Sequence, residues 1–277
     1  MSASTPDNGK TRPRKVTTKS LLRMKQRGEP ISALTAYDFL MAQLLDSAGV
    51  DVVLVGDSAG MVVQGLDTTV PVTLDQMLYH ATVVARGVKR ALVVGDMPFM
   101  SFQVNPDEAL RNAGRLIKES GVEAVKLEGG IKLCPTIERI VDVGIPVMGH
   151  LGLTPQSIHK FGTYQVRATS DEEAEEIRRD AIALEQAGVF GIVLEKVPAE
   201  LGTEVARSVK IPVIGIGAGP HVDGQILVSH DMLGIYTRFK PRFVRRYAEL
   251  ATIMLEAFSN YVGDVKSHEF PTSGESY

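Results

Sequence analysis

Short apolar segments recur along the chain and are separated by longer amphipathic segments. The apolar segments consist mostly of Val, Ile and Leu without polar alternation, a pattern typical of strands buried on both faces of a parallel sheet. We predict eight such strands within the following ranges: 31–38, 50–58, 91–99, 124–130, 145–153, 191–198, 211–219 and 225–235.

The segments between the predicted strands carry helix start and stop signals. Three of them begin with a polar N-cap residue followed three positions later by Glu or Gln; these pairs are Thr73 and Gln76, Asn105 and Glu108, and Ser170 and Glu173. Glycine follows the predicted end of three helices, where a left-handed residue closes the last turn; the glycines are Gly121, Gly144 and Gly188. Further helices are predicted at about 17–27 and 241–262.

Eight strands alternating with helices in about 250 residues predict an α/β fold of the (β/α)8 TIM-barrel type. Residues 219–225 are too few for a helix between the last two strands, which leaves a doubly wound open sheet as the alternative. We predict a single catalytic domain at 16–265, a disordered basic tail at 1–15 and a flexible C-terminal tail at 266–277.

Composition excludes several classes of protein. The 277 residues are 44% hydrophobic and 23% charged, which is ordinary for a globular chain and excludes a disordered one. The net charge of −3 gives no reason to expect nucleic acid as a partner, and no apolar stretch is long enough to cross a membrane. One cysteine, Cys134, excludes an intramolecular disulfide and fits a reducing compartment, so we predict a cytoplasmic protein.

Candidate chemistry lies where polar residues end apolar strands, because the active sites of barrels form at the carboxyl ends of their strands. Lys126 and Glu128 are two positions apart in AVKLE and therefore share one face, which must be the inner face near the barrel mouth. The candidate residues are Asp57, Ser58, Asp96, Lys126, Glu128, His150 and Glu195.

Three of these candidates, Asp57, Asp96 and Glu128, end successive strands and should converge. Unpaired carboxylates at such distances repel one another, and a hard divalent cation such as Mg²⁺ would relieve the repulsion. Salt bridges or helix caps are the alternative interpretation for each acid taken alone. Glu195 follows four apolar residues and is a candidate general base or acid, whereas His150 fits a catalytic role and a satisfied polar residue equally well.

Several segments together resemble the 3-methyl-2-oxobutanoate hydroxymethyltransferase family, also called ketopantoate hydroxymethyltransferases. The resemblance runs from about residue 16 to about residue 260. The segments that carry it are VGDSAGMVVQGLDTTVPVT (55–73), DMPFMSF (96–102), VKLEGG (125–130), GHLGLTPQS (149–157) and IPVIGIGAGPHVDGQILVSHDMLG (211–234).

The resemblance implies a (β/α)8 barrel related to the phosphoenolpyruvate/pyruvate enzymes. It implies transfer of a hydroxymethyl group from 5,10-methylenetetrahydrofolate to 2-oxoisovalerate, giving ketopantoate through a Mg²⁺-stabilised enolate. This is the first committed step towards pantothenate and coenzyme A. Family members form large homo-oligomers, commonly decamers, so the resemblance also implies a homo-oligomer that acts on small-molecule substrates.

Residue roles are implied position by position. Asp57 and Asp96 resemble magnesium ligands that also bracket the substrate, and Glu128 resembles a third metal-site acid that acts directly or through water. The remaining four residues resemble groups that contact the substrate or the proton: Ser58 for the substrate carboxylate, Lys126 as a second anchor, Glu195 as proton acceptor and His150 near the substrate.

Two competing functions remain open from the residues alone. One is a Mg²⁺-dependent C–C lyase or mutase of the same barrel superfamily, acting on an oxo acid without folate. The other is a barrel that binds an oxo acid without turnover, which a charged cluster at every strand end argues against. Incubation with 2-oxoisovalerate and Mg²⁺, with and without methylenetetrahydrofolate, would separate these functions.

Overall fold

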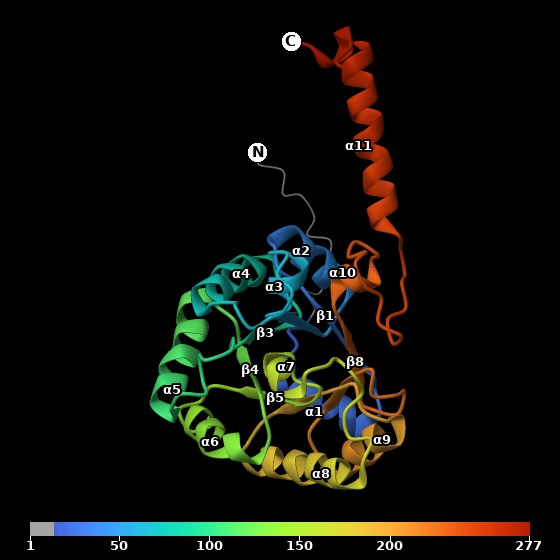
Figure 1. Ribbon diagram of the computed structural model, residues 1–277. Coiled ribbons are helices and arrows are strands. Elements are labelled where there is room, and N and C mark those ends of the chain that lie inside the picture. The colour runs from blue at the N-terminus through green and yellow to red at the C-terminus, as the bar shows by residue number, and fades with distance from the viewer. Residues whose placement is uncertain (1–13) are drawn as a thin grey trace, which may run out of the picture.

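The computed structural model describes residues 14–277, in which eight parallel strands form a closed barrel (Figure 1). Most of the tail predicted at 1–15 lies outside the described residues. The strands are β1 Ile31–Thr35, β2 Val52–Val55, β3 Leu92–Asp96, β4 Ala124–Glu128, β5 Val147–Gly152, β6 Gly191–Glu195, β7 Val213–Ile216 and β8 Gly224–Leu227.

Closure of the sheet confirms the barrel and excludes the open-sheet alternative. Strand β1 pairs with β2 on one side, with Ala33 opposite Val52, and with β8 on the other, with Ile31 opposite Gly224. The chain between β7 and β8 contains no helix and turns back as a loop, in which the Asp223 N–H donates to the Val213 carbonyl at 2.9 Å. The last crossover is therefore short but keeps the parallel register.

Helices form a ring around the barrel, and α1 (Thr18–Arg27) lies behind the strands in the view of Figure 1. Leu21 of α1 is buried in one cluster with Ile31 and Val52 near the starts of their strands, so α1 closes the end of the barrel opposite the predicted site. The helices are α1 Thr18–Arg27, α2 Phe39–Ala48, α3 Ala59–Val62, α4 Leu74–Gly87, α5 Pro106–Arg115, α6 Cys134–Asp142, α7 Ile158–Phe161, α8 Asp171–Gln186, α9 Ala199–Ser208, α10 Ser229–Met232 and α11 Leu250–Ser267.

Most of the predicted helix signals are present in the structure. The capping box beginning at Thr73 is complete, and the Asn105 side chain caps α5. Ser170 caps α8, but Glu173 does not return the bond and instead accepts from the Ala168 N–H at 2.7 Å. Ser170 and Glu173 therefore do not form the reciprocal pair of hydrogen bonds that Thr73 and Gln76 form. The predicted C-terminal glycines have φ values of 81°, 90° and 92°: Gly121, Gly144 and Gly188.

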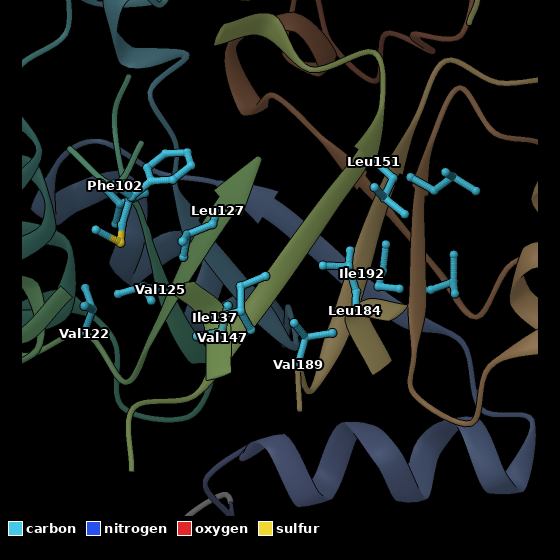
Figure 2. Close-up of a cluster of buried hydrophobic side chains, with 14 of the residues drawn as sticks. Phe102, Val122, Val125, Leu127, Ile137, Val147, Leu151, Leu184, Val189 and Ile192 are labelled. Carbon is cyan, nitrogen blue, oxygen red and sulfur yellow. The ribbon is translucent and has the colours of Figure 1, made fainter. Parts of the chain in front are cut away.

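Two apolar layers hold the fold together, one inside the barrel and one between the sheet and the helices. Val125 and Leu127 point outward into the second layer, which also contains Ile137 of α6; farther round the sheet, Leu184 of α8 lies beside Ile192 (Figure 2). Alternation along β4 then turns Lys126 inward. The predicted inner face of this strand is confirmed.

The last helix differs from the prediction of 241–262. Helix α11 begins at Leu250 and ends at Ser267, and residues 236–249 form a loop tied back by hydrogen bonds from the Tyr247 N–H to the Met232 carbonyl and from the Leu250 N–H to the Leu233 carbonyl. The helix projects away from the barrel (Figure 1). Its exposed apolar residues are Ile253, Met254, Leu255, Phe258, Tyr261, Val262 and Val265.

No helix within residues 14–277 combines the length and the apolar composition that a bilayer-crossing segment needs.

Candidate active site

The seven predicted site residues lie together at the carboxyl ends of five adjacent strands. They come from the turn after β2 and from β3, β4, β5 and β6. All of them line one cavity of about 60 Å³ at the barrel mouth. The cavity brings together Asp57, Ser58, Asp96, Lys126, Glu128, His150 and Glu195.

A buried lysine lies among the carboxylates. The Lys126 Nζ is 2.8 Å from Asp96 Oδ1 and 3.8 Å from Glu128 Oε1, and its side chain is only 4% exposed. Burial by itself lowers the pKa of Lys126, but the carboxylates of Asp96, Glu128 and Asp57 outweigh it and raise the pKa above its usual value. The ammonium therefore stays charged and compensates part of the negative charge in the cavity.

The Asp57 and Asp96 carboxylates keep an excess of negative charge. The Asp57 N–H donates to Asp96 Oδ2 at 3.0 Å. Burial raises the pKa of Asp57 well above its usual range, and the neighbouring Asp96 and Glu128 charges raise it further. Burial likewise raises the pKa of Asp96, although Lys126 opposes the rise. Both acids would be more stable as carboxylates if a further cation were present.

Glu128 and His150 form a second charged pair. Glu128 Oε1 is 3.1 Å from His150 Nδ1. Although burial opposes it, this histidine and Lys126 lower the pKa of Glu128. Burial and Lys126 lower the pKa of His150, but contacts with Glu128 and Glu195 outweigh them and raise it. A protonated Nδ1 donates to Glu128, whereas an unprotonated one accepts from the Lys126 ammonium, also 3.1 Å away.

Glu195 lies on the other side of the imidazole. Its Oε2 is 3.4 Å from His150 Nε2, which has no hydrogen-bond partner among the described residues. Glu195 does not pair with the neighbouring Lys196, a contact that would have made it a structural residue. The Lys196 ammonium instead donates to the Tyr164 carbonyl. Glu195 is therefore available for proton transfer in the cavity.

Gln156 is a site residue that the strand-end rule missed. It lies in a short turn, Pro155–Ser157, after β5, and is 4% exposed. Its side-chain amide donates to Asp57 Oδ2 at 2.9 Å, and its backbone N–H donates to Glu128 Oε2 at 3.0 Å. It thus fixes carboxylates that come from two different strands.

Tyr37, just after β1, is the second residue that the sequence did not reveal. Its hydroxyl is 2.7 Å from Ser58 Oγ, and the side chain is buried. Burial raises the pKa of Tyr37, although the hydrogen bond with Ser58 opposes the rise, so the phenol stays neutral. The tyrosine orients the serine hydroxyl at the floor of the cavity.

The donor set fits a hard divalent cation held by two carboxylates. Asp57 and Asp96 offer only oxygen, and Asp96 Oδ1 has no aligned hydrogen bond within the described residues despite the nearby ammonium. Both oxygens of Glu128 face protein donors. Within 14–277 no group of three or more His, Cys, Asp or Glu side chains is placed to hold a metal by itself. Such a cation would need oxygens from substrate or water, which is typical of Mg²⁺.

We expect Gln156→Met to lower catalytic activity by about 10- to 100-fold, because residues that orient a metal-site carboxylate have effects of this size. The substitution keeps the side-chain length but removes the donor to Asp57. The measurement is the Mg²⁺ concentration at half-maximal activity together with the maximal rate. Gln165→Met, on an exposed side chain, is the matched control; equal effects in both variants would contradict the assignment.

Comparisons with known proteins bear on this site. A sequence model of the family described as "Ketopantoate hydroxymethyltransferase" matches residues 15–273. A protein named 3-methyl-2-oxobutanoate hydroxymethyltransferase from Christiangramia forsetii is 62% identical over 264 residues, covering 95% of this chain and 97% of its own. The protein of the same name from Bacteroides thetaiotaomicron is 61% identical, with coverage of 95% and 97%.

Solved structures share the fold at low sequence identity. A phosphonopyruvate hydrolase in complex with oxalate and Mg²⁺ has a TM-score of 0.62 at 14% identity, covering 94% of this chain and 93% of its own. A 2,3-dimethylmalate lyase of the PEP mutase/isocitrate lyase superfamily has a TM-score of 0.57 at 18% identity, with coverage of 94% and 91%. The predicted barrel type is thereby confirmed.

Proposed function

Because the chain belongs to the ketopantoate hydroxymethyltransferase family, we propose that its cavity binds 2-oxoisovalerate and adds a hydroxymethyl group taken from 5,10-methylenetetrahydrofolate. The chain is an enzyme that transfers a hydroxymethyl group, as its relatives' names state. One observation supports the more detailed proposal. The Lys126 ammonium, the carboxylates of Asp57 and Asp96, and a His150 nitrogen without a hydrogen-bond partner among the described residues share one small cavity.

The cavity suits a short branched oxo acid. One wall is polar, with the Ser58 hydroxyl and the Lys126 ammonium suited to the carboxylate and oxo oxygens of the substrate. The apolar part of the lining suits the isopropyl group; it consists of Leu54, Val193, Ile216 and Ile226. Because Ile216 is the register partner of Glu195 across β6 and β7, this division would place C3 within reach of the Glu195 carboxylate.

Asp57 and Asp96 would hold Mg²⁺, with Glu128 acting through water because both of its oxygens already face protein donors. When bound, Mg²⁺ supplies Lewis-acid stabilisation of negative charge on substrate oxygens. Lys126 adds a fixed positive charge beside the same oxygens as the C3 proton leaves. Gln156 keeps the Asp57 carboxylate in place throughout.

Glu195 is proposed as the group that moves the proton, with His150 as its positioning residue through the 3.4 Å contact. We expect Glu195→Gln to slow exchange of the C3 proton of 2-oxoisovalerate into deuterated water by roughly 100-fold or more, which is the usual scale for general base catalysis. Proton NMR of the substrate follows the exchange. An unchanged exchange rate would contradict the assignment of Glu195 as the C3 base. Its remaining role would then be proton transfer at the folate nitrogen.

Dependence on the folate tests the proposed reaction. We expect ketopantoate to form from 2-oxoisovalerate and Mg²⁺ only when methylenetetrahydrofolate is added. Cleavage or rearrangement of an oxo acid without folate would instead favour the lyase or mutase class.

Assembly, location and pathway are further parts of the proposal. The exposed apolar residues of α11 support a homo-oligomer, for which family resemblance suggests a decamer. The single cysteine supports a cytoplasmic location. Ketopantoate formation would place the enzyme at the first committed step towards pantothenate. Light scattering on the purified full-length chain measures the mass of the assembly.

A further inference from the structure

The substrate cavity leaves no room for a second, larger reactant. Its volume is about 60 Å³, which suits a small oxo acid alone. Two larger cavities adjoin it, of about 160 Å³ and about 550 Å³. A folate must bind in one of them with its one-carbon unit directed at the substrate.

The 160 Å³ cavity, which we call the aromatic pocket, opens onto the reacting end of the substrate cavity. The two cavities share Glu195, Ile216 and Val228. Glu195 therefore faces both reactants, as a group that moves a proton between them must. Because Ile216 belongs to the apolar wall of the substrate cavity, the shared boundary lies on the side where the isopropyl group and C3 are placed.

The walls of the aromatic pocket match a flat heterocycle. Tyr164, Tyr236 and Phe243 line it. Aromatic rings bind other rings by offset stacking or edge-to-face contact, each worth about 0.5–1.5 kcal/mol beyond the buried area. A pterin ring has a flat face and polar edges. The aromatic walls suit the face, whereas the edges need hydrogen-bond partners.

Asp231 provides a hydrogen-bond acceptor for the polar edge of such a ring. It lines the aromatic pocket, is half-buried, and its carboxylate makes no hydrogen bond or ion pair within residues 14–277. Burial raises the pKa of Asp231 to about 6. Arg246, the cation that opposes this rise, is paired with Glu249 at 2.9 Å. A half-buried carboxylate left without donors is complementary to a ligand edge that carries two adjacent N–H donors.

A cationic loop follows directly after this pocket. Residues 236–247 contain no acidic residue, and four members of the loop line the aromatic pocket itself: Tyr236, Phe239, Pro241 and Phe243. The exposed cations of the loop are Arg238, Lys240, Arg242 and Arg245. An anionic tail leaving the pocket towards solvent would therefore meet positive charge.

We propose that the aromatic pocket binds the pterin of the reduced folate, with Asp231 pairing with its aminopyrimidinone edge and the loop 236–247 attracting its glutamate tail. This assignment rests on the proposed function, which names the folate as one-carbon donor. It places the methylene carbon next to Glu195 and the substrate.

The larger cavity offers weaker complementarity. Two of its acidic side chains are already engaged, with Asp180 accepting from the Ile131 N–H at 2.8 Å and Glu173 paired with Arg167. A third, Glu176, is exposed to solvent. It meets the substrate cavity at Glu128 and His150, which already contact each other. Asp180 is nonetheless a half-buried carboxylate with a pKa raised by burial, which makes it a matched control for Asp231.

Calorimetric titration of the full-length enzyme with tetrahydrofolate, which lacks the transferable carbon, tests the assignment without turnover. We expect Asp231→Asn to weaken binding by about 10- to 100-fold, as loss of a charged hydrogen-bond pair does, and Asp180→Asn to change it less than about twofold. Tyr236→Leu gives a second test if Asp231→Asn does not fold, and should weaken binding by about 5- to 10-fold.

The outcomes separate the two levels of the proposal. If wild type binds tetrahydrofolate and Asp231→Asn or Tyr236→Leu binds it equally well, the pocket assignment is overturned while the proposed function stands. If Asp180→Asn alone weakens binding, the larger cavity is the folate site. If wild type does not bind tetrahydrofolate in the presence of 2-oxoisovalerate and Mg²⁺, the proposed function fails along with the assignment.

The role of the loop has its own readout. We expect wild type to bind tetrahydrofolate triglutamate more tightly than the monoglutamate, and the double variant Lys240→Gln, Arg242→Gln to show a smaller preference. Unchanged preference in the double variant would overturn the assignment of the tail to this loop.

Discussion

Replacing Asp57 by asparagine is expected to reduce ketopantoate formation by about 10²- to 10³-fold, equivalent to roughly 3 to 4 kcal/mol of lost stabilisation. The substitution removes one of two carboxylates that would hold the cation but keeps an oxygen that can accept from Gln156. Because burial raises the pKa of Asp57 so far, a neutral side chain should fit the metal-free cavity at least as well. We therefore expect the melting temperature without Mg²⁺ to be unchanged or higher.

Titration with Mn²⁺, followed by electron paramagnetic resonance, gives a readout independent of activity. Asp57→Asn and Asp96→Asn should each weaken Mn²⁺ binding by at least about tenfold. Asp51→Asn is the matched control, since Asp51 is a buried aspartate that binds Arg90 away from this cavity. Retained Mn²⁺ affinity in both site variants would contradict the assignment of these carboxylates.

Replacing Lys126 by methionine is expected to cause the second large effect, this time on stability as well as activity. Methionine fills a similar volume but leaves Asp96, Glu128 and Asp57 buried without the ammonium that compensates them. Removing one partner from a buried charged group costs about 3 to 5 kcal/mol. We expect a fall in melting temperature of roughly 10 °C for a domain of this size.

The double variant Lys126→Met, Asp96→Asn separates the electrostatic cause from loss of packing. If uncompensated charge is responsible, removing the Asp96 carboxylate should restore part of the lost melting temperature. Added Mg²⁺ should also raise the melting temperature of Lys126→Met more than that of wild type, because the ion can take over part of the compensation. Equal melting temperatures for the single variant and wild type would contradict the charge argument.

The arrangement of the barrel was predictable because short stretches of sequence indicate both which strands are buried and which polar residues end them. Asp96 follows an uninterrupted apolar run and Glu128 ends the mostly apolar strand AVKLE, so their position at the mouth follows from the parallel sheet. The inward direction of Lys126 follows from alternation along β4. These features depend on a few neighbouring residues and on the geometry of a strand.

Contacts made by loops were not predictable in the same way. Gln156 lies six positions beyond His150, in a short turn whose path depends on the packing of the whole rim. Tyr37 and Ser58 follow the neighbouring strands β1 and β2, and nothing near either residue in sequence indicates the contact between them. Such pairings are fixed by tertiary structure, and a single sequence carries no signal for them.

The final helix was misplaced for a related reason. Residues from 241 onward carry helix-forming side chains, but the chain at Tyr247 and Leu250 is held to α10 and the residues after it by backbone hydrogen bonds. Those bonds delay the helix until Leu250. Local propensity was overridden by tertiary contacts, which is the usual limit of this kind of prediction.

The central claim is that this cavity removes the C3 proton of 2-oxoisovalerate and then directs the resulting carbon at a folate-borne one-carbon unit. Proton NMR of wild type with 2-oxoisovalerate and Mg²⁺ in deuterated water measures both stages in one sample. We predict loss of the C3 proton signal before any folate is present, and ketopantoate only after methylenetetrahydrofolate is added. Exchange that proceeds equally fast with heat-denatured enzyme, or the lack of ketopantoate after folate is added, would contradict the account.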